Sequence, residues 1–247
     1  RDLHYFNYWG RIPRELKRNG ATIYYGNQEA LGTIVYNAED IKTRILTVLE
    51  ETGCKKVNII AHSKGGLDAR YAISKLQMAP YVASLTTMNT PHRGCRFVDY
   101  ACKLPDGLYR LVASCFDRTF RKFGDKNPDF YTATHQFSTK ASELFNKEVI
   151  DAKGVYYQSY TSKMKHPWSH LLLSIPYCLI KPLEGDNDGL VSVTSAKWGE
   201  FKGVFSNSHT RGISHGDIID LKREDYKGFD PVETYVKIVN DLKEKGF

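Results

Sequence analysis

The chain has 247 residues, of which 41% are hydrophobic and 26% charged, and its formal net charge is +7. This composition is ordinary for a globular α/β protein, and a chain of this length can bury a core without cross-links. The positive charges are spread along the sequence, so nucleic acid is not an expected partner, and no apolar run is long enough for a transmembrane segment. The five cysteines are odd in number and lack metal-ligand spacing, which argues against a disulfide framework.

Hydrophobic periodicity and capping residues predict strands that alternate with helices. In the first part of the chain we expect a helix from Trp9 to Gly20, a strand over 21–26, and a helix over 37–53 that is capped by Asn37 and ended by Gly53. A strand over 55–62 and a helix from Ser63 to about Leu76 follow. Strands are then expected over 82–90 and 154–164, and a last helix after Asp230 with Pro231 in its first turn. This alternation predicts an α/β fold with a mostly parallel, doubly wound sheet.

Residues 95–150 interrupt the alternation and are rich in aromatic side chains. We interpret them as a helical cap, or lid, inserted into a single domain that spans residues 1–247. The alternative is a plain helical excursion packed on the edge of the sheet.

The segment IIAHSKGGLDARY, residues 59–71, joins a predicted strand to a predicted helix. It is close to the G-x-S-x-G elbow, in which a serine sits on a sharp strand-to-helix turn with its Oγ exposed above the sheet. Ser63 is therefore a candidate nucleophile, although such a segment can also be a simple glycine-rich connection.

A nucleophilic serine needs a base and a third group that orients the base, and in α/β-hydrolases these follow the serine in the order acid, then histidine. GDNDGLVS, residues 185–192, offers Asp186 and Asp188 in a turn before an apolar stretch. GISHGDIID, residues 212–220, supplies His215 in a loop before the last helix. The order of the motifs favours a Ser-Asp-His triad, with either aspartate as the acid.

The motifs IIAHSKGGLDARY, TTMNTPHRG, GDNDGLVS and ISHGD, in this order, resemble the bacterial true lipases of the Pseudomonas and Burkholderia type. The resemblance covers most of the chain and is weakest in the cap and in residues 165–184. It implies an α/β-hydrolase fold with a mobile helical lid, and ester hydrolysis. It also implies Ser63 as nucleophile, His215 as base, Asp188 as acid and the Lys64 N–H as one oxyanion donor.

The chain departs from this family in two places. Ala61 stands where the elbow usually begins with glycine, which is compatible with the turn if the close backbone approach falls at Gly65. The family also binds a structural calcium ion near the histidine, and Asp217 matches one of its ligands. However, no Asp or Glu lies between Asp151 and Glu184, so the upstream ligand is missing. Calcium favours several carboxylates, and we therefore expect no cofactor requirement.

The leading interpretation is a serine ester hydrolase, a lipase or carboxylesterase, that meets its substrate at a lipid–water interface. The aromatic cap and the stretch from Trp168 to Ile180 would supply an apolar acyl site. An acyltransferase with the same triad and a non-catalytic binding protein of the same fold are the alternatives.

A second oxyanion donor is expected from a loop after an earlier central strand, often following a His-Gly pair. Only RDLHYFN precedes Tyr8 and Trp9, and it contains no His-Gly. We therefore expect a short apolar strand and a His-Gly-type loop just before Arg1, lying in the sheet between residues 21–26 and residues 55–62.

Overall fold

The computed structural model describes residues 2–3, 6–30, 32–103, 107, 130–208 and 211–247. Its main sheet has four parallel strands in the order β3-β4-β5-β6. These strands are β3 (Val57–His62), β4 (Val82–Met88), β5 (Tyr156–Ser162) and β6 (Glu200–Phe205). A separate small hairpin pairs β1 (Asp2–Leu3) with β2 (Phe6–Asn7).

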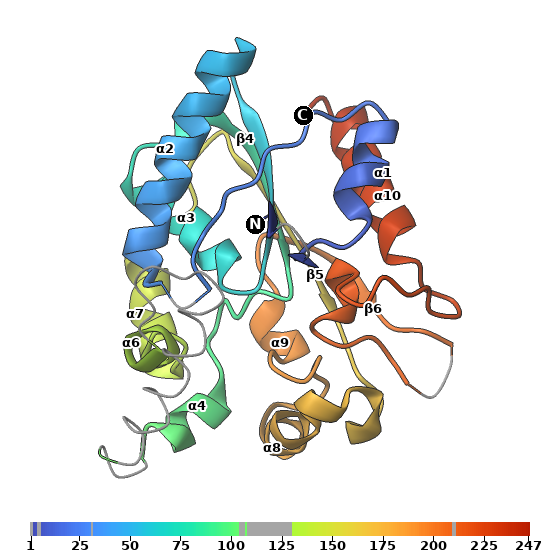
Figure 1. Ribbon diagram of the computed structural model, residues 1–247. Helices are drawn as coiled ribbons and strands as arrows, with labels where there is room; N and C mark the ends of the chain where they lie inside the picture. Colours follow the sequence, from blue (N-terminus) through green and yellow to red (C-terminus); the bar gives the residue numbers. More distant parts are fainter. Residues whose placement is uncertain (1, 4–5, 31, 104–106, 108–129, 209–210) are drawn as a thin grey trace.

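Helices cover both faces of this sheet (Figure 1). On one face lie α2 (Ile34–Thr52) and α3 (Gly65–Lys75), and on the other lie α1 (Ile12–Arg18) and α10 (Pro231–Glu244). Side chains alternate between the two faces along a strand. Leu85 and Tyr157 accordingly join the core under α2 and α3, while Met88 and Tyr160 join the core under α1 and α10. The parallel, doubly wound α/β fold is confirmed.

Several smaller elements lie at the end of the sheet where the parallel strands have their carboxyl ends (Figure 1). They are α4 (Arg96–Ala101), α6 (Phe130–His135), α7 (Thr139–Glu148), α8 (Ser174–Glu184) and α9 (Val193–Ala196). The remaining short turns are the 3₁₀ helices η1 (Ala79–Tyr81), η2 (Pro167–Ser169), η3 (Leu171–Leu173) and η4 (Asp217–Ile219). No helix in the described ranges is both long and apolar enough to cross a membrane.

The predicted cap over residues 95–150 is helical in the parts that the structure describes, namely α4, α6 and α7. These helices lie at the same end of the sheet as Ser63 (Figure 1). Residues 104–106 and 108–129, the centre of the predicted cap, lie outside the described residues. That the segment acts as a lid stays a prediction.

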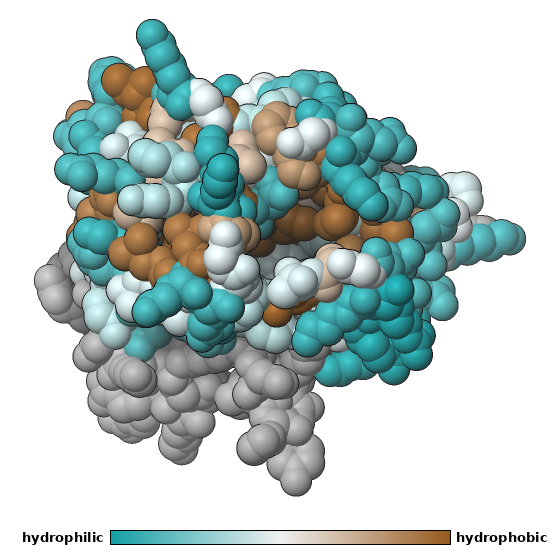
Figure 2. Space-filling view, turned by 90° about the horizontal axis from the view of Figure 1, so that it is seen from above, coloured by the Kyte–Doolittle hydropathy of each residue, from teal (hydrophilic) through white to brown (hydrophobic). Residues whose placement is uncertain are grey.

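The predicted strand over residues 21–26 is wrong, because these residues form no ladder with any described strand. Ala21 and Ile23 instead pack against the core under α1 and α10. Among the described strands β3 pairs with β4 alone, and its residues Val57, Ile59 and Ile60 are half-buried, whereas β4 is almost fully buried. Viewed from the amino ends of the strands, hydrophobic residues gather in the middle of the surface, among hydrophilic margins (Figure 2). The strand expected before Arg1 stays a prediction.

Element boundaries follow local capping in most places. Asp230 caps α10 by accepting hydrogen bonds from Val232 N (2.8 Å) and Glu233 N (3.1 Å), as expected. Gly53 ends α2 in the left-handed region at φ 68°. The predicted cap at Asn37 is wrong, since α2 begins three residues earlier under Thr33, whose hydroxyl accepts from Tyr36 N.

Candidate active site

Ser63 occupies the turn between β3 and α3, with a φ of 54° that is unusual for a residue with a side chain. Its N–H donates to the carbonyl of Met88 at the end of β4, at 2.9 Å. The strained turn is thus fixed to the neighbouring strand, and the serine is held at the carboxyl edge of the sheet, half-buried. This is the local geometry of a nucleophile elbow.

The close approach in this elbow falls at Gly66 rather than at Gly65, which corrects the expectation from the sequence. A Cβ at Gly66 would lie 2.2 Å from Thr90 Oγ1, so no other residue fits without movement. A Cβ at Gly65 would meet only the Ala61 methyl, at 3.9 Å, which is an ordinary contact. Alanine is therefore tolerated at the first position of the elbow, where its buried methyl makes only ordinary contacts with Gly65.

Lys64 is the N-cap of α3, so its N–H lies at the amino end of the helix, where backbone donors lack intrahelical acceptors. Its buried side chain turns inward, and Nζ lies 2.9 Å and 2.8 Å from the two carboxylate oxygens of Asp68. Asn37 Nδ2 donates to the same carboxylate at 2.9 Å and to the carbonyl of Glu29 at 2.8 Å. The residue after the serine is therefore anchored to both α3 and α2.

Burial raises the pKa of Asp68 to about 6, although the charge of Lys64 and hydrogen bonds from Lys64 and Asn37 oppose the shift. The carboxylate is thus ionised and paired at neutral pH. This network was not predicted from the sequence. The spacing of Lys64 and Asp68, four residues apart on a helix, is a signal for the pair, whereas the link to Asn37 spans 31 residues.

Asp188 and His215 meet in the fold. His215 Nδ1 lies 2.7 Å from Asp188 Oδ2, and His215 N donates to the carbonyl of Asp188 at 2.8 Å. Asp188 has no exposed surface, and its other oxygen accepts from Leu190 N (2.8 Å) and Val191 N (2.7 Å). With these donors the carboxylate can act only as an acceptor, so His215 donates its Nδ1 proton and leaves Nε2 free to take a proton.

Asp186, the other candidate acid, points elsewhere. Its oxygens pair with Lys163 Nζ at 2.7 Å and Lys181 Nζ at 2.6 Å, and its side chain is 43% exposed. These two hydrogen bonds lower the pKa of Asp186 to about 2. It holds the turn before Asp188 in place and makes no contact with His215 in the described structure.

His62 connects the elbow to the loop of His215. Its Nε2 lies 3.0 Å from the carbonyl of His215, its Nδ1 lies 2.6 Å from Tyr8 Oη, and the two imidazole centroids are 4.4 Å apart. A carbonyl can only accept, so Nε2 carries the proton and Nδ1 accepts from the Tyr8 hydroxyl. Burial, and then the charge of His215, hold the pKa of His62 well below its ordinary value. His62 therefore stays neutral beside His215, a role that sequence reasoning missed because the partners are far apart in the chain.

Asp217, the candidate calcium ligand, is fully buried and already paired. Arg211 Nη1 and Nη2 lie 3.0 Å and 3.2 Å from its two oxygens, and Ser214 N and Tyr226 Oη donate to it at 2.9 Å and 2.8 Å. Among the described residues, no group of three His, Cys, Asp or Glu could hold a metal ion. The residues around Asp217 therefore do not fit calcium, because a guanidinium occupies the place of the cation.

Arg211 also ties the histidine loop to a distant segment. Its Nε donates to the carbonyl of Ser169 at 2.9 Å, while its own carbonyl accepts from the Ser169 hydroxyl. At the other end of the loop, the carboxylate of buried Asp220 accepts from Arg11 N (2.7 Å), Nε (2.9 Å) and Nη2 (2.8 Å). Two arginine–aspartate pairs thus fix the segment that carries His215.

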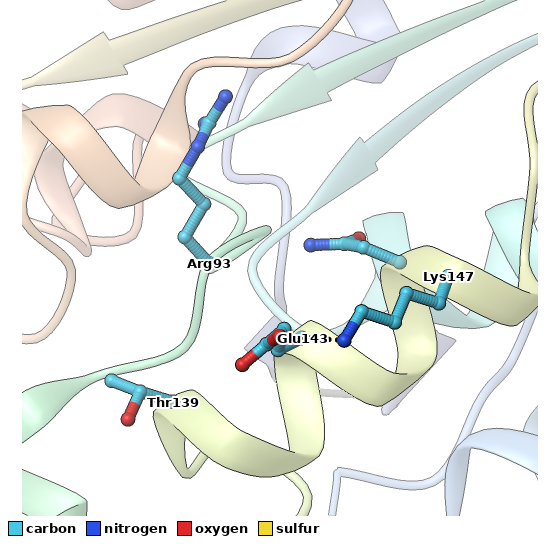
Figure 3. A pocket seen from close by; sticks show the side chains of 5 residues that line it. Arg93, Thr139, Glu143 and Lys147 are labelled. Atoms are coloured by element: carbon cyan, nitrogen blue, oxygen red, sulfur yellow. Dashed lines mark hydrogen bonds and ion pairs between the residues drawn. The ribbon is translucent and has the colours of Figure 1, made fainter.

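A pocket of about 340 Å³ lies between the turn after β4 and α7 (Figure 3). It is lined by Arg93, Thr139, Glu143, Asn146 and Lys147, and its Glu143 and Lys147 side chains pair along α7 at 2.7 Å. None of Ser63, Asp188 and His215 lines it. Its charged lining is unsuited to an apolar acyl chain, and we do not assign it to the site around Ser63.

Comparisons with known proteins relate the chain to serine esterases and lipases. Residues 25–106, which contain the elbow, match the family described as "Putative serine esterase (DUF676)". Triacylglycerol lipase 2 of Saccharomyces cerevisiae is 28% identical over 265 residues, covering 97% of this chain and 74% of the yeast protein. The triacylglycerol lipase of Burkholderia plantarii is 36% identical over 158 residues, covering 59% of this chain and 43% of that protein. The chain is a serine ester hydrolase. In fold it is similar to the metagenomic carboxyl esterase MGS0156, with a TM-score of 0.74 at 15% identity over 97% of this chain and 70% of that one, which confirms the α/β-hydrolase fold.

Proposed function

We propose that the protein is a lipase of the Pseudomonas and Burkholderia type that hydrolyses carboxylic esters of apolar acyl chains. Ser63 is the nucleophile, His215 the general base and Asp188 the residue that orients it. The observation that carries the proposal is the 2.7 Å contact between Asp188 and His215. His62, the residue before Ser63, holds the His215 loop next to the elbow through its contact with the carbonyl of His215.

In this mechanism His215 Nε2 takes the hydroxyl proton of Ser63 as Oγ attacks the ester carbonyl carbon. The negative charge that develops on the carbonyl oxygen is stabilised by the Lys64 N–H and by the amino end of α3. His215 then protonates the leaving alcohol, and an acyl-enzyme remains on Ser63. Water, deprotonated by the same histidine, releases the acid.

The surrounding groups suit this cycle because they keep His215 in one orientation. Asp188 favours the imidazolium that forms in each half-reaction, whereas His62 adds no positive charge beside it. The buried pair between Lys64 and Asp68 fixes the backbone of the oxyanion donor before substrate binds, which is the preorganisation that such donors need.

Hydrolysis of p-nitrophenyl esters of increasing acyl length, and of emulsified triacylglycerol, tests the proposal. We expect turnover of both substrate types by the wild type. Ser63→Ala should abolish it while leaving the circular dichroism spectrum and the urea midpoint unchanged. Removal of a triad member typically costs several orders of magnitude in kcat, so a variant that keeps more than about a tenth of the activity would contradict the assignment.

A further inference from the structure

The segment formed by η2, η3 and α8 is apolar on two opposite sides. Its inner side packs on α4, where Ile180 is fully buried in one cluster with Cys95 and Val98. Its outer side, which we call the α8 apolar face, consists of Trp168 (77% exposed), Leu171 (77%), Leu172 (84%), Ile175 (75%) and Leu179 (51%). Scattered exposed apolar residues are normal, but five large ones within twelve residues form a surface that water does not favour.

The sequence predicts that the stretch from Trp168 to Ile180 supplies the acyl site, whereas the structure leaves most of its large side chains exposed to solvent. Only Tyr177 and Ile180 of this stretch, besides the small Ser169, are fully buried. A helix that is apolar on its solvent side as well as on its core side is expected to be covered by something else.

The α8 apolar face adjoins the candidate active site. α8 ends at Glu184, and its C-cap Gly185 comes directly before the turn that carries Asp188. A Cβ at Gly189 would lie 2.8 Å from the Cβ of Leu173, the N-cap of α8, so the start of α8 packs tightly on that turn. α8 also lies at the carboxyl end of the sheet, where β3 leads into Ser63 (Figure 1). Whatever covers the face therefore lies beside the residues proposed to cleave the ester.

The charge around this face is weakly positive. Residues 163–186 contain Lys163, Lys165 and Lys181, with His166 and His170, against Glu184 and Asp186. Lys163 and Lys181 pair with Asp186, whereas Lys165 is exposed next to η2. Aliphatic side chains with a tryptophan, bordered by lysines, are the composition of segments that lie in the interface of an anionic bilayer. A second copy of the chain would bring two basic margins together, which disfavours a dimer through this face.

We propose that the α8 apolar face docks the protein onto a lipid surface that carries anionic head groups. Leu171, Leu172 and Ile175 enter the acyl region, Trp168 lies at the head-group level, and Lys165 contacts the anionic groups. Docking would bring Ser63 to a water-insoluble ester, and in this purpose it rests on the proposed lipase function. The binding to lipid itself does not depend on that function.

Vesicle flotation tests the docking without turnover when the protein carries Ser63→Ala. Vesicles of phosphatidylcholine alone are compared with vesicles that also contain phosphatidylserine. We expect stronger binding to the anionic vesicles and a weakening of that binding by salt. The double variant Leu171→Ser, Leu172→Ser should reduce the partition coefficient by about tenfold or more, because two aliphatic side chains no longer insert. Leu46→Ser, on α2 and 41% exposed, is the matched control and should bind as the parent does.

Activity separates this inference from the proposed function. In the Ser63 background, the double variant should hydrolyse a soluble short-chain ester at the wild-type rate and emulsified triacylglycerol several-fold more slowly. Docking is refuted if the parent binds neither kind of vesicle, if the double variant binds as well as the control, or if the face instead drives concentration-dependent dimers that the double variant abolishes. Vesicle binding by a protein that hydrolyses no ester would sustain the docking and refute the lipase function.

Discussion

Replacement of Arg211 by alanine tests whether an internal guanidinium holds the histidine loop in place of a metal ion. The substitution removes the guanidinium from the carboxylate of Asp217, which has no exposed surface, and leaves Lys222 Nζ at 3.9 Å from its Oδ1. Breaking a buried pair in this way typically costs about 3–5 kcal/mol. Here the cost should be nearer the lower end, because the Arg211 side chain is 27% exposed and Asp217 keeps its hydrogen bonds from Ser214 and Tyr226. The lost hydrogen bond to Ser169 adds about 1 kcal/mol, so we expect a total of about 4 kcal/mol.

Urea unfolding at pH 7 measures this loss, and Lys147→Ala is the matched control. Lys147 pairs with Glu143 at 2.7 Å, but both side chains are 67% exposed, so the control should lose less than about 1 kcal/mol. The double variant Arg211→Ala, Asp217→Asn removes both charges and should recover a large part of the stability. Chelation of calcium should change neither the unfolding midpoint nor the activity of the wild type.

The pH dependence gives an independent check. Burial raises the pKa of Asp217. Hydrogen bonds from Ser214, the charge of Arg211 and a hydrogen bond from Tyr226 together lower this pKa by more than burial raises it, so the net shift is downward. A lowered folded pKa contributes stability that is present above the ordinary value of 3.8 and is lost below it. Without Arg211 the same carboxyl takes up a proton at higher pH, so the difference between wild type and variant should shrink as the pH falls from 7 towards 4. A loss below about 0.5 kcal/mol at pH 7, or a calcium requirement in the wild type, would refute the reasoning.

Three further predictions concern the candidate acids, His62 and the buried Asp68. Asp188→Asn should lower kcat by orders of magnitude, whereas Asp186→Asn should change kcat by less than about threefold; equal effects would mean that the acid is misassigned. His62→Phe should lower kcat more than it raises KM, since it leaves the hydroxyl of Tyr8 and the carbonyl of His215 unpaired, and an unchanged pH–rate profile with full kcat would contradict this role. Relative to Asp68→Asn, the wild type should gain stability as the pH falls from about 6 to 3.8, because burial raises the pKa of the Asp68 carboxyl in the folded state above its value in the unfolded state. Parallel stability curves for the two proteins would argue against that pKa shift.

The features that the sequence predicts well are those encoded by a few neighbouring residues. The N-cap at Asp230, the C-cap at Gly53 and the elbow at Ser63 each depend on a local signal, and the structure contains all three. The order of the three motifs also selects His215, because loops that follow parallel strands meet at one edge of the sheet.

The features that the sequence does not predict depend on distant partners. Residues 21–26 have the composition of a strand, but a strand needs a neighbour, and these residues have no described partner in the sheet. β6 was missed because Gly203 interrupts its alternation of polar and apolar residues, and α8 because Pro176 and Pro182 argue against a helix. Asn37 has the appearance of a cap, and its link to Asp68 becomes visible only in the fold.

Labelling by a fluorophosphonate shows whether Ser63 is the nucleophile. Intact-mass and peptide analysis of the labelled protein should show one adduct, on the peptide that contains Ser63, together with loss of ester hydrolysis in proportion to labelling. Ser63→Ala should take up no probe, and Asp188→Asn should react far more slowly. An adduct on another residue, or a protein that hydrolyses esters at full rate after Ser63 is blocked, would contradict the account.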